Sequence, residues 1–256
     1  MLKNQRHLEI LEILEAERFV GVADLSRRLY ASQPTIRRDL DILEKQGYLR
    51  RSHGGAVLAD EGHPPISFRS GTHTKEKQVI CRAAATLVPP SSFLFIDAST
   101  TALPLAGMLR PQDNVRILTN GLHTAKSFSE KGHQIYSTGG RLLSDSLAFV
   151  GDTAMATVER YSADLMFFSS SSLDDTGMIS DYSEEETALR LCMAKYARKK
   201  VFLCDSAKFG TTSVFRLFPL SEVDYVVTAV PLDETIVASN RLTLRRLQNA
   251  CLYCRE

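Results

Sequence analysis

Apolar and polar positions over the first sixty residues predict three short helices followed by a β-hairpin. Residues 6–17 repeat leucine and isoleucine at helical spacing, with glutamates between them. A second helix is expected after Gly21, and a third from Ser32 to about Gln46. Residues 48–58 then predict two short strands around a Gly-Gly turn. This order of elements is that of a winged helix-turn-helix.

The third of these helices is amphipathic. Ile36, Leu40 and Leu43 follow the spacing i, i+4, i+7 and form one apolar face. Arginine and glutamine on the other face can read bases in the major groove, while lysine and hydroxyl groups suit phosphates. The predicted DNA-contacting residues of this helix and the hairpin are Ser32, Gln33, Thr35, Arg37, Arg38, Lys45, Arg50, Arg51 and His53.

The charge of this region differs from that of the whole chain. The 256 residues carry a net charge of only +1, but residues 26–53 hold seven cations and three anions, a net charge of +4. A local basic face of this kind favours contact with nucleic acid. Asp39 would oppose such contact, so we expect it to hold an arginine in position.

The rest of the chain changes to a different pattern. Residues 59–74 are polar and interrupted by Pro64 and Pro65, which indicates a linker. Apolar runs typical of strands then alternate with helical segments, which predicts an α/β domain with a largely parallel sheet. The expected strands are 93–96, 115–118, 134–136, 165–168, 201–203 and 225–227, and the expected helices are 75–87, 101–109, 122–130, 152–161 and 183–197.

These patterns divide the chain into four parts. They are a DNA-binding domain (1–58), a linker (59–74), an effector-binding domain (75–237) and a C-terminal tail (238–256). The tail is rich in arginine and is expected to form an exposed terminal helix.

Polar residues follow several of the predicted strands. Ligands of open α/β sheets bind beyond the carboxyl ends of the strands, and small polar residues before a helix suit phosphate. The sequence therefore predicts a site for a hydroxylated, phosphorylated ligand. Its residues are Asp97, Ser99, Thr100 and Thr101 after the first strand, Thr119 and Asn120 after the second, Gly139 and Gly140 after the third, and Asp205 and Lys208 after a later one.

Composition narrows the class of protein further. Hydrophobic residues make up 44% and charged residues 24% of the chain, an ordinary globular balance. No apolar run has the length of a membrane span, and the N-terminus lacks the core of a signal peptide. Five cysteines include one C-x-x-C pair, Cys251 and Cys254, without further metal ligands nearby. We expect reduced thiols, no metal, no cofactor and a cytoplasmic location.

Two stretches of the first domain carry a family resemblance. The segment from Ser32 to Leu40 reads SQPTIRRDL, and HGGA follows at residues 53–56. Both resemble the DeoR family of bacterial transcriptional regulators. Residues 75–228 resemble the effector-binding domain of that family, which is related in fold to ribose-5-phosphate isomerases and coenzyme A transferases. The resemblance adds Gly151, Asp181, Glu185 and Gly210 to the matching positions.

The resemblance implies a transcriptional regulator, expected to repress a carbohydrate-metabolism operon. Its expected partners are operator DNA, a phosphorylated sugar or related metabolite, and further copies of the chain in a dimer or tetramer. Two positions depart from the family, which usually has glycine in place of Ser99 and of the serines at 169–172. We expect these serines to alter effector binding. Two alternatives remain open here: a sugar-phosphate isomerase with an appended DNA-binding module, and a DNA-binding protein without an effector.

Overall fold

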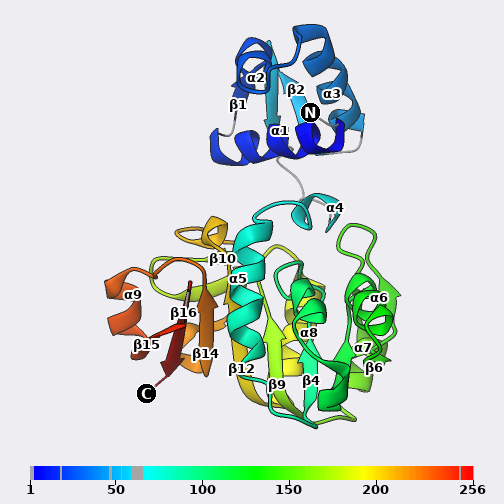
Figure 1. Ribbon diagram of the computed structural model, residues 1–256, viewed down its shortest axis with the longest axis vertical. Coiled ribbons are helices and arrows are strands. Elements are labelled where there is room, and N and C mark those ends of the chain that lie inside the picture. The colour runs from blue at the N-terminus through cyan, green and yellow to red at the C-terminus, as the bar shows by residue number, and fades with distance from the viewer. Residues whose placement is uncertain are drawn as a thin grey trace. The chain divides into compact units, whose positions relative to one another are not determined.

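The computed structural model describes residues 3–17, 19–45, 48–52, 54–58, 66–247 and 249–255. The chain divides into two compact units, Met1–Thr72 and His73–Glu256 (Figure 1). Among the described residues, no helix combines the length and the apolar character that a bilayer crossing requires.

The N-terminal unit contains the predicted three helices and hairpin. Its elements are α1 (Lys3–Glu17), β1 (Phe19–Gly21), α2 (Val22–Arg28), α3 (Gln33–Lys45), β2 (Leu49–Ser52), β3 (Gly55–Leu58) and α4 (Ile66–Arg69). Ile36, Leu40 and Leu43 of α3 are fully buried, as their spacing predicted. Strand β1 was not predicted, because three residues become a strand only by pairing with β3. Helix α4 lies within the segment that the sequence assigned to a linker.

The C-terminal unit is built on an eight-stranded sheet in the order β15-β16-β14-β12-β9-β4-β5-β6, which starts with β15 (Leu242–Leu247) and β16 (Ala250–Arg255). The six strands from β14 to β6 are parallel. All six correspond to predicted strands, and they confirm the α/β class. They are β4 (Phe93–Ile96), β5 (Arg116–Thr119), β6 (Gln134–Ser137), β9 (Ala163–Phe168), β12 (Ala197–Cys204) and β14 (Tyr225–Thr228).

Helices cover both faces of this sheet. Successive side chains of a strand point to opposite faces, so Phe93 and Phe95 enter one core while Leu94 and Ile96 enter the other. Helices α5 (Thr74–Ala85) and α6 (Leu122–Glu130) supply the core that contains Leu94. Helices α7 (Asp152–Val158) and α8 (Glu184–Lys195) supply the other. The result is a three-layer arrangement, with α5 in front of the sheet in Figure 1.

Two expectations about the C-terminal unit were wrong. Residues 101–109 were expected to form a helix, but only Leu103–Gly107 do so, as a 3-10 helix with proline in its first turn. The tail was expected to form an exposed helix. Instead, α9 (Glu234–Ser239) is followed by a hairpin of β15 (Leu242–Leu247) and β16 (Ala250–Arg255).

The hairpin forms because its apolar residues complete the sheet. Strand β16 lies between β14 and β15 and pairs antiparallel with both. Ala250 and Leu252 enter one core and Cys251 and Tyr253 the other, so the continuous apolar run is that of a strand buried on both faces. The remaining strands form two small sheets: β7 (Arg141–Leu142) with β8 (Phe149–Val150), and β10 (Ser172–Leu173) with β11 (Met178–Asp181) and β13 (Phe215–Pro219).

Candidate functional site

Helix α3 presents a polar, exposed face opposite its buried one. Gln33, Arg37, Arg38 and Lys45 are exposed, and none of their side chains has a hydrogen-bond or ion-pair partner among the described residues. At the start of the helix, the hydroxyl of Ser32 accepts a hydrogen bond from the backbone N–H of Thr35 at 3.4 Å. The hydroxyl groups of Ser32 and Thr35 lie 2.8 Å apart. The face that the sequence assigned to DNA is therefore open to a ligand.

Asp39 explains how α3 is held. Its carboxylate accepts hydrogen bonds from Arg6 at 2.5 Å and contacts the His7 ring at 2.9 Å, both on α1. Burial alone raises the pKa of Asp39, but the hydrogen bonds from Arg6 and His7 outweigh it and hold the pKa below its ordinary value. The expectation that Asp39 positions an arginine is confirmed. That arginine lies on α1, so the pair joins α1 to α3.

The wing residues differ in their surroundings. Arg51 is half-buried and bound to α3: its guanidinium contacts Asp41 and the carbonyl oxygen of Arg37, and its backbone N–H donates to Glu44 at 2.6 Å. Arg50 is exposed. His53 lies outside the described residues. Arg51 thus secures the hairpin against α3.

In the C-terminal unit, the strand ends bring together a lysine, a threonine and an aspartate. The ammonium group of Lys208 donates to the Thr101 hydroxyl at 2.9 Å and contacts the Asp205 carboxylate. Thr101 in turn donates to Asp205 at 3.1 Å. Burial raises the pKa of Asp205, but Lys208 outweighs this effect and keeps it below its ordinary value. The predicted site segments after β4 and after β12, which are far apart in the sequence, are therefore in contact.

Helix α5 adds a second lysine that the sequence analysis missed. Lys77 is buried and donates to the Thr100 hydroxyl at 3.2 Å. Its neighbour Cys81 donates to the Thr101 carbonyl oxygen at 3.0 Å, and burial raises the pKa of this thiol to about 12, so it stays protonated. The sequence signal that could have identified Lys77 is its helical position, because Lys77 lies on the apolar face of α5 together with Ile80 and Cys81.

Glu76 of the same helix fixes the loop after β12. It accepts hydrogen bonds from the backbone N–H of Ser206 at 2.9 Å and from its hydroxyl at 2.8 Å. This loop carries Lys208, in the short helix Ser206–Lys208. Helix α5 therefore positions both strand-end loops of the cluster. We call Lys77, Thr100, Thr101, Asp205 and Lys208 the lysine-threonine cluster.

A buried arginine, also missed, organises the remaining carboxylates. Arg190 of α8 donates to Asp97 at 2.9 Å, to Asp181 at 2.8 Å and to Glu186 at 3.0 Å. All four side chains are buried. Although burial opposes its charge, these carboxylates raise the pKa of Arg190. We call these four residues the Arg190 cluster.

The two predicted aspartates of this cluster hold backbone loops. Asp97 also accepts hydrogen bonds from the backbone N–H groups of Ser99 and Ser169, at 3.0 and 3.2 Å. Asp181 accepts from the hydroxyls of Ser170 and Ser171, at 3.1 and 3.0 Å. Their carboxylate oxygens are therefore occupied within the protein. The serine run is a hydrogen-bonded segment that connects the two aspartates, with Ser169, Ser170 and Ser172 buried.

The other predicted residues lie after β5 and β6. The Thr119 hydroxyl accepts from the backbone N–H of Gly121 at 3.0 Å, and the Asn120 amide donates to the Phe149 carbonyl at 3.2 Å. Gly139 and Gly140 have φ values of 63° and 109°, and a Cβ on Gly140 would lie 2.6 Å from the Val150 carbonyl oxygen. These residues shape the loops, and glycine is required at 140.

Glu185 contacts neither the lysine-threonine cluster nor the Arg190 cluster among the interactions of the described residues. It is exposed and pairs with Arg141, while its neighbour Glu186 is buried against Arg190. The sequence could not choose among three consecutive glutamates, because helical phase is set by what α8 packs against.

Comparison with known proteins covers nearly the whole chain. The DeoR-like helix-turn-helix domain matches residues 6–62, and the DeoR C terminal sensor domain matches residues 72–229. The glycerol-3-phosphate regulon repressor of Escherichia coli K12 is 31% identical, over 90% of this chain and 92% of its own. The uncharacterized HTH-type transcriptional regulator YulB of Bacillus subtilis is 34% identical, over 93% of each chain.

Solved structures resemble the chain only weakly. A ribose 5-phosphate isomerase of Methanocaldococcus jannaschii reaches a TM-score of 0.41 at 12% identity, covering 54% of this chain and 55% of its own. The family assignment therefore rests on the two matched domains and the full-length relatives. The chain belongs to the DeoR family of transcriptional regulators, with a helix-turn-helix domain followed by a sensor domain.

Proposed function

We propose that this protein represses a carbohydrate-metabolism operon and that a phosphorylated sugar or related metabolite releases it from DNA. The observation that carries this proposal is the lysine-threonine cluster. Lys208 has three ammonium hydrogens, and its contacts to Asp205 and Thr101 leave one for a phosphate oxygen. The E. coli relative, named for the glycerol-3-phosphate regulon, supports a small phosphorylated effector.

The residues take different roles in this proposal. Thr100 offers a hydroxyl donor to the phosphate, and Lys77 and Lys208 offer ammonium donors, while Thr101 helps to hold Lys208. Asp205 orients Lys208, and the Arg190 cluster fixes the loops on which the donors stand. Predicted residues in the loops after β5 and β6, with Asn120 and Gly140 among them, shape the sugar-facing side of the site.

The effector acts on DNA binding through an equilibrium between two states. It can shift that equilibrium only by binding one state more tightly than the other.

We further propose a homodimer or homotetramer, because helix-turn-helix proteins usually read two half-sites, and a cytoplasmic location. The DNA-binding domain comprises residues 1–58, and the segment 59–74 joins it to the sensor domain, with Phe68 of α4 packed in the N-terminal core. The sensor domain begins at residue 75 and includes β16, which pairs with β14.

Replacing Arg37 or Arg38 with alanine should weaken DNA binding by roughly 1–3 kcal/mol for a lost base contact. Affinity is measured by fluorescence anisotropy on a duplex that the native protein selects from a random-sequence pool. Native binding should also weaken steeply with rising salt, because phosphate contacts release counterions. Arg110→Ala is the matched control, since Arg110 is an exposed arginine of the other unit. Unchanged affinity of both α3 variants would refute the assignment.

Replacing Lys208 with alanine should leave DNA affinity unchanged and abolish release by the effector. The effector is first identified by a thermal-shift screen of sugar phosphates and sugar acids against the native protein. Lys131→Ala, which removes an exposed lysine, should respond like the native chain. If no phosphorylated metabolite shifts the native protein, the alternative of a DNA-binding protein without an effector is favoured.

The isomerase alternative makes a separate prediction. Acid–base catalysis needs a carboxylate free to exchange a proton with the substrate, whereas Asp97 and Asp181 are occupied by Arg190 and backbone or hydroxyl donors. We therefore expect no turnover when the protein is incubated with pentose phosphates. Conversion at enzymatic rates would favour the isomerase.

A further inference from the structure

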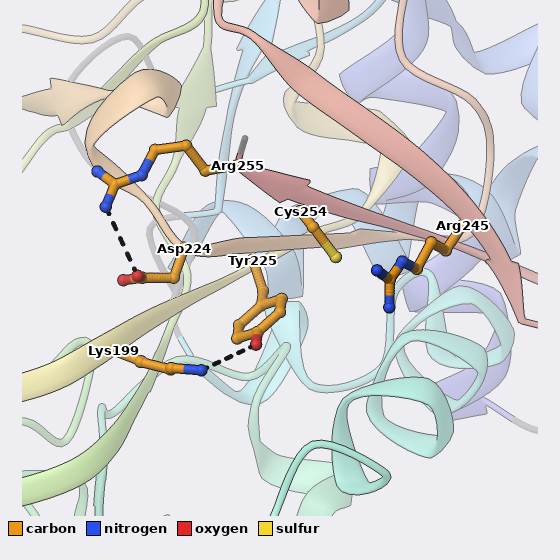
Figure 2. Close-up of a pocket in the computed structure, with 6 residues that line it drawn as sticks. All are labelled: Lys199, Asp224, Tyr225, Arg245, Cys254 and Arg255. Carbon is orange, nitrogen blue, oxygen red and sulfur yellow. Dashed lines mark hydrogen bonds and ion pairs between the residues drawn. The ribbon is translucent and has the colours of Figure 1, made fainter.

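A basic hollow lies beside the C-terminal hairpin, apart from the lysine-threonine cluster. It has a volume of about 350 Å³ and is lined by residues of β12, β14, β15 and β16, together with the residue before β14. The lining residues are Lys199, Asp224, Tyr225, Arg245, Cys254 and Arg255 (Figure 2). We call this cavity the hairpin hollow.

The hairpin hollow and the lysine-threonine cluster lie at opposite ends of strand β12. Lys199 stands near the start of β12, whereas Asp205 follows its end. Six residues of strand span roughly 20 Å at ~3.3 Å per residue. Moreover, Arg245, Cys254 and Arg255 lie beyond residue 229, where the matched sensor domain ends. The hollow is therefore not part of the proposed effector site.

Cations exceed anions in the hairpin hollow. Three cationic side chains, Lys199, Arg245 and Arg255, face one carboxylate, Asp224. Arg255 forms an ion pair with that carboxylate at 3.8 Å and also donates a hydrogen bond to the Ser221 carbonyl oxygen at 3.2 Å. The side chain of Arg245 has no hydrogen-bond or ion-pair partner among the residues that the structure describes. The lining thus carries more positive charge than its single carboxylate, Asp224, can balance.

Lys199 and Tyr225 provide directed donors in the same hollow. The ammonium group of Lys199 donates to the Tyr225 hydroxyl at 3.1 Å, and this hydrogen bond raises the pKa of Lys199 above its ordinary value. The lysine keeps two further hydrogens, and the tyrosine hydroxyl keeps its own proton to donate. An acceptor with several oxygens can therefore bind to both.

We propose that the hairpin hollow binds a small anion bearing a phosphate group, as a second ligand site of the sensor unit. Arg245 supplies a planar pair of donors, which suits two phosphate oxygens, and Lys199 and Tyr225 supply the others. A volume of about 350 Å³ accommodates a phosphate monoester of a small metabolite, since small-molecule sites begin at about 300 Å³. Free inorganic phosphate shares the same chemistry.

Cys254 reports on this site directly. It lines the hollow and is partly buried (Figure 2), while Cys192 on α8 is partly buried elsewhere. The full chain is alkylated with neutral iodoacetamide, and the labelling rate of each cysteine is followed by peptide mass spectrometry. Inorganic phosphate should slow the labelling of Cys254 saturably and leave Cys192 unchanged. A phosphate monoester that protects at lower concentration would identify an organic ligand as the preferred occupant.

Two adjacent arginines provide the matched pair of variants. Arg245 lies opposite Leu252 and Arg246 opposite Cys251 in the hairpin register, so the two side chains point to opposite faces of the sheet. Arg245→Gln should raise the phosphate concentration for half-protection roughly tenfold, the loss expected for one charge-assisted hydrogen bond. Arg246→Gln makes the same change in net charge and should leave half-protection unaltered.

Specific outcomes would overturn the proposal. They are the absence of Cys254 protection in the native chain, equal protection by sodium chloride at the same ionic strength, and equal effects of Arg245→Gln and Arg246→Gln. Lys208→Ala separates this proposal from the effector function. If Cys254 protection survives in that variant, the hollow binds independently of the lysine-threonine cluster, and if protection is lost there, the hollow is not a separate site.

Discussion

Replacing Arg190 with methionine is expected to destabilise the sensor unit by about 3–5 kcal/mol, because it leaves buried carboxylates without their cation. Arg190 contacts three of them, Asp97, Asp181 and Glu186, at 2.8–3.0 Å. Natural domains are stable by only about 5–15 kcal/mol, so the loss is a large fraction of the total. Urea unfolding of the full chain, followed by far-ultraviolet circular dichroism, measures it.

Two further variants make the result interpretable. Arg190→Lys retains one charge but cannot reach three carboxylates in the planar geometry of a guanidinium, so an intermediate loss is expected. Arg198→Met removes an exposed arginine that lies 3.6 Å from Asp164, and a surface pair contributes at most about 1 kcal/mol. If Arg190→Met proved no more destabilising than Arg198→Met, the Arg190 cluster would not hold the site together.

Replacing Asp39 with asparagine is expected to destabilise the N-terminal unit by roughly 1.5–3 kcal/mol, the contribution of hydrogen bonds to a charged group. The substitution removes the negative charge that Arg6 and His7 contact and keeps the shape of the side chain. It should also weaken DNA binding, because α3 is held against α1 by this contact. Glu12→Gln, which removes an exposed carboxylate of α1, is the control for stability.

The same contact makes stability depend on acid pH. Because the pKa of Asp39 is lower in the folded chain, its stabilising contribution is present above the ordinary aspartate pKa of about 3.9 and is lost as pH falls through the folded value. Urea unfolding of the N-terminal unit across the acid range should therefore show a decline that Asp39→Asn reduces. A decline of equal size in native chain and variant would assign the acid sensitivity to other carboxylates.

Much of the fold follows from local patterns in the sequence. The apolar spacing of Ile36, Leu40 and Leu43 predicted the buried face of α3, and the apolar runs predicted all six parallel strands. These features depend on periodicity, which a helix or strand expresses wherever it packs. The tail was assigned wrongly for the opposite reason. Ala250–Tyr253 is a continuous apolar run without a period, and its state depends on the neighbouring strand β14.

The candidate site likewise combines features that could be predicted from the sequence with features that only the tertiary structure decided. The sequence determined which residue types follow each strand, and this was enough to select Thr101, Asp205 and Lys208, since parallel strands end at one edge of a sheet. Tertiary structure alone decided which charges meet. Arg190 reaches Asp97 across 93 positions of the chain, and Lys77 enters the cluster from a helix.

The sequence by itself thus determined the family, the two domains and the exposed basic face of α3, because local spacing and composition carry that information. The tertiary structure decided that Asp97 and Asp181 bind Arg190, and that Glu186 is buried where Glu185 is exposed. It also decided that Arg245 faces a hollow while Arg246 faces away. The physical reason is that a buried charge is tolerated only beside its partner, and partners distant in sequence meet only after the chain has folded.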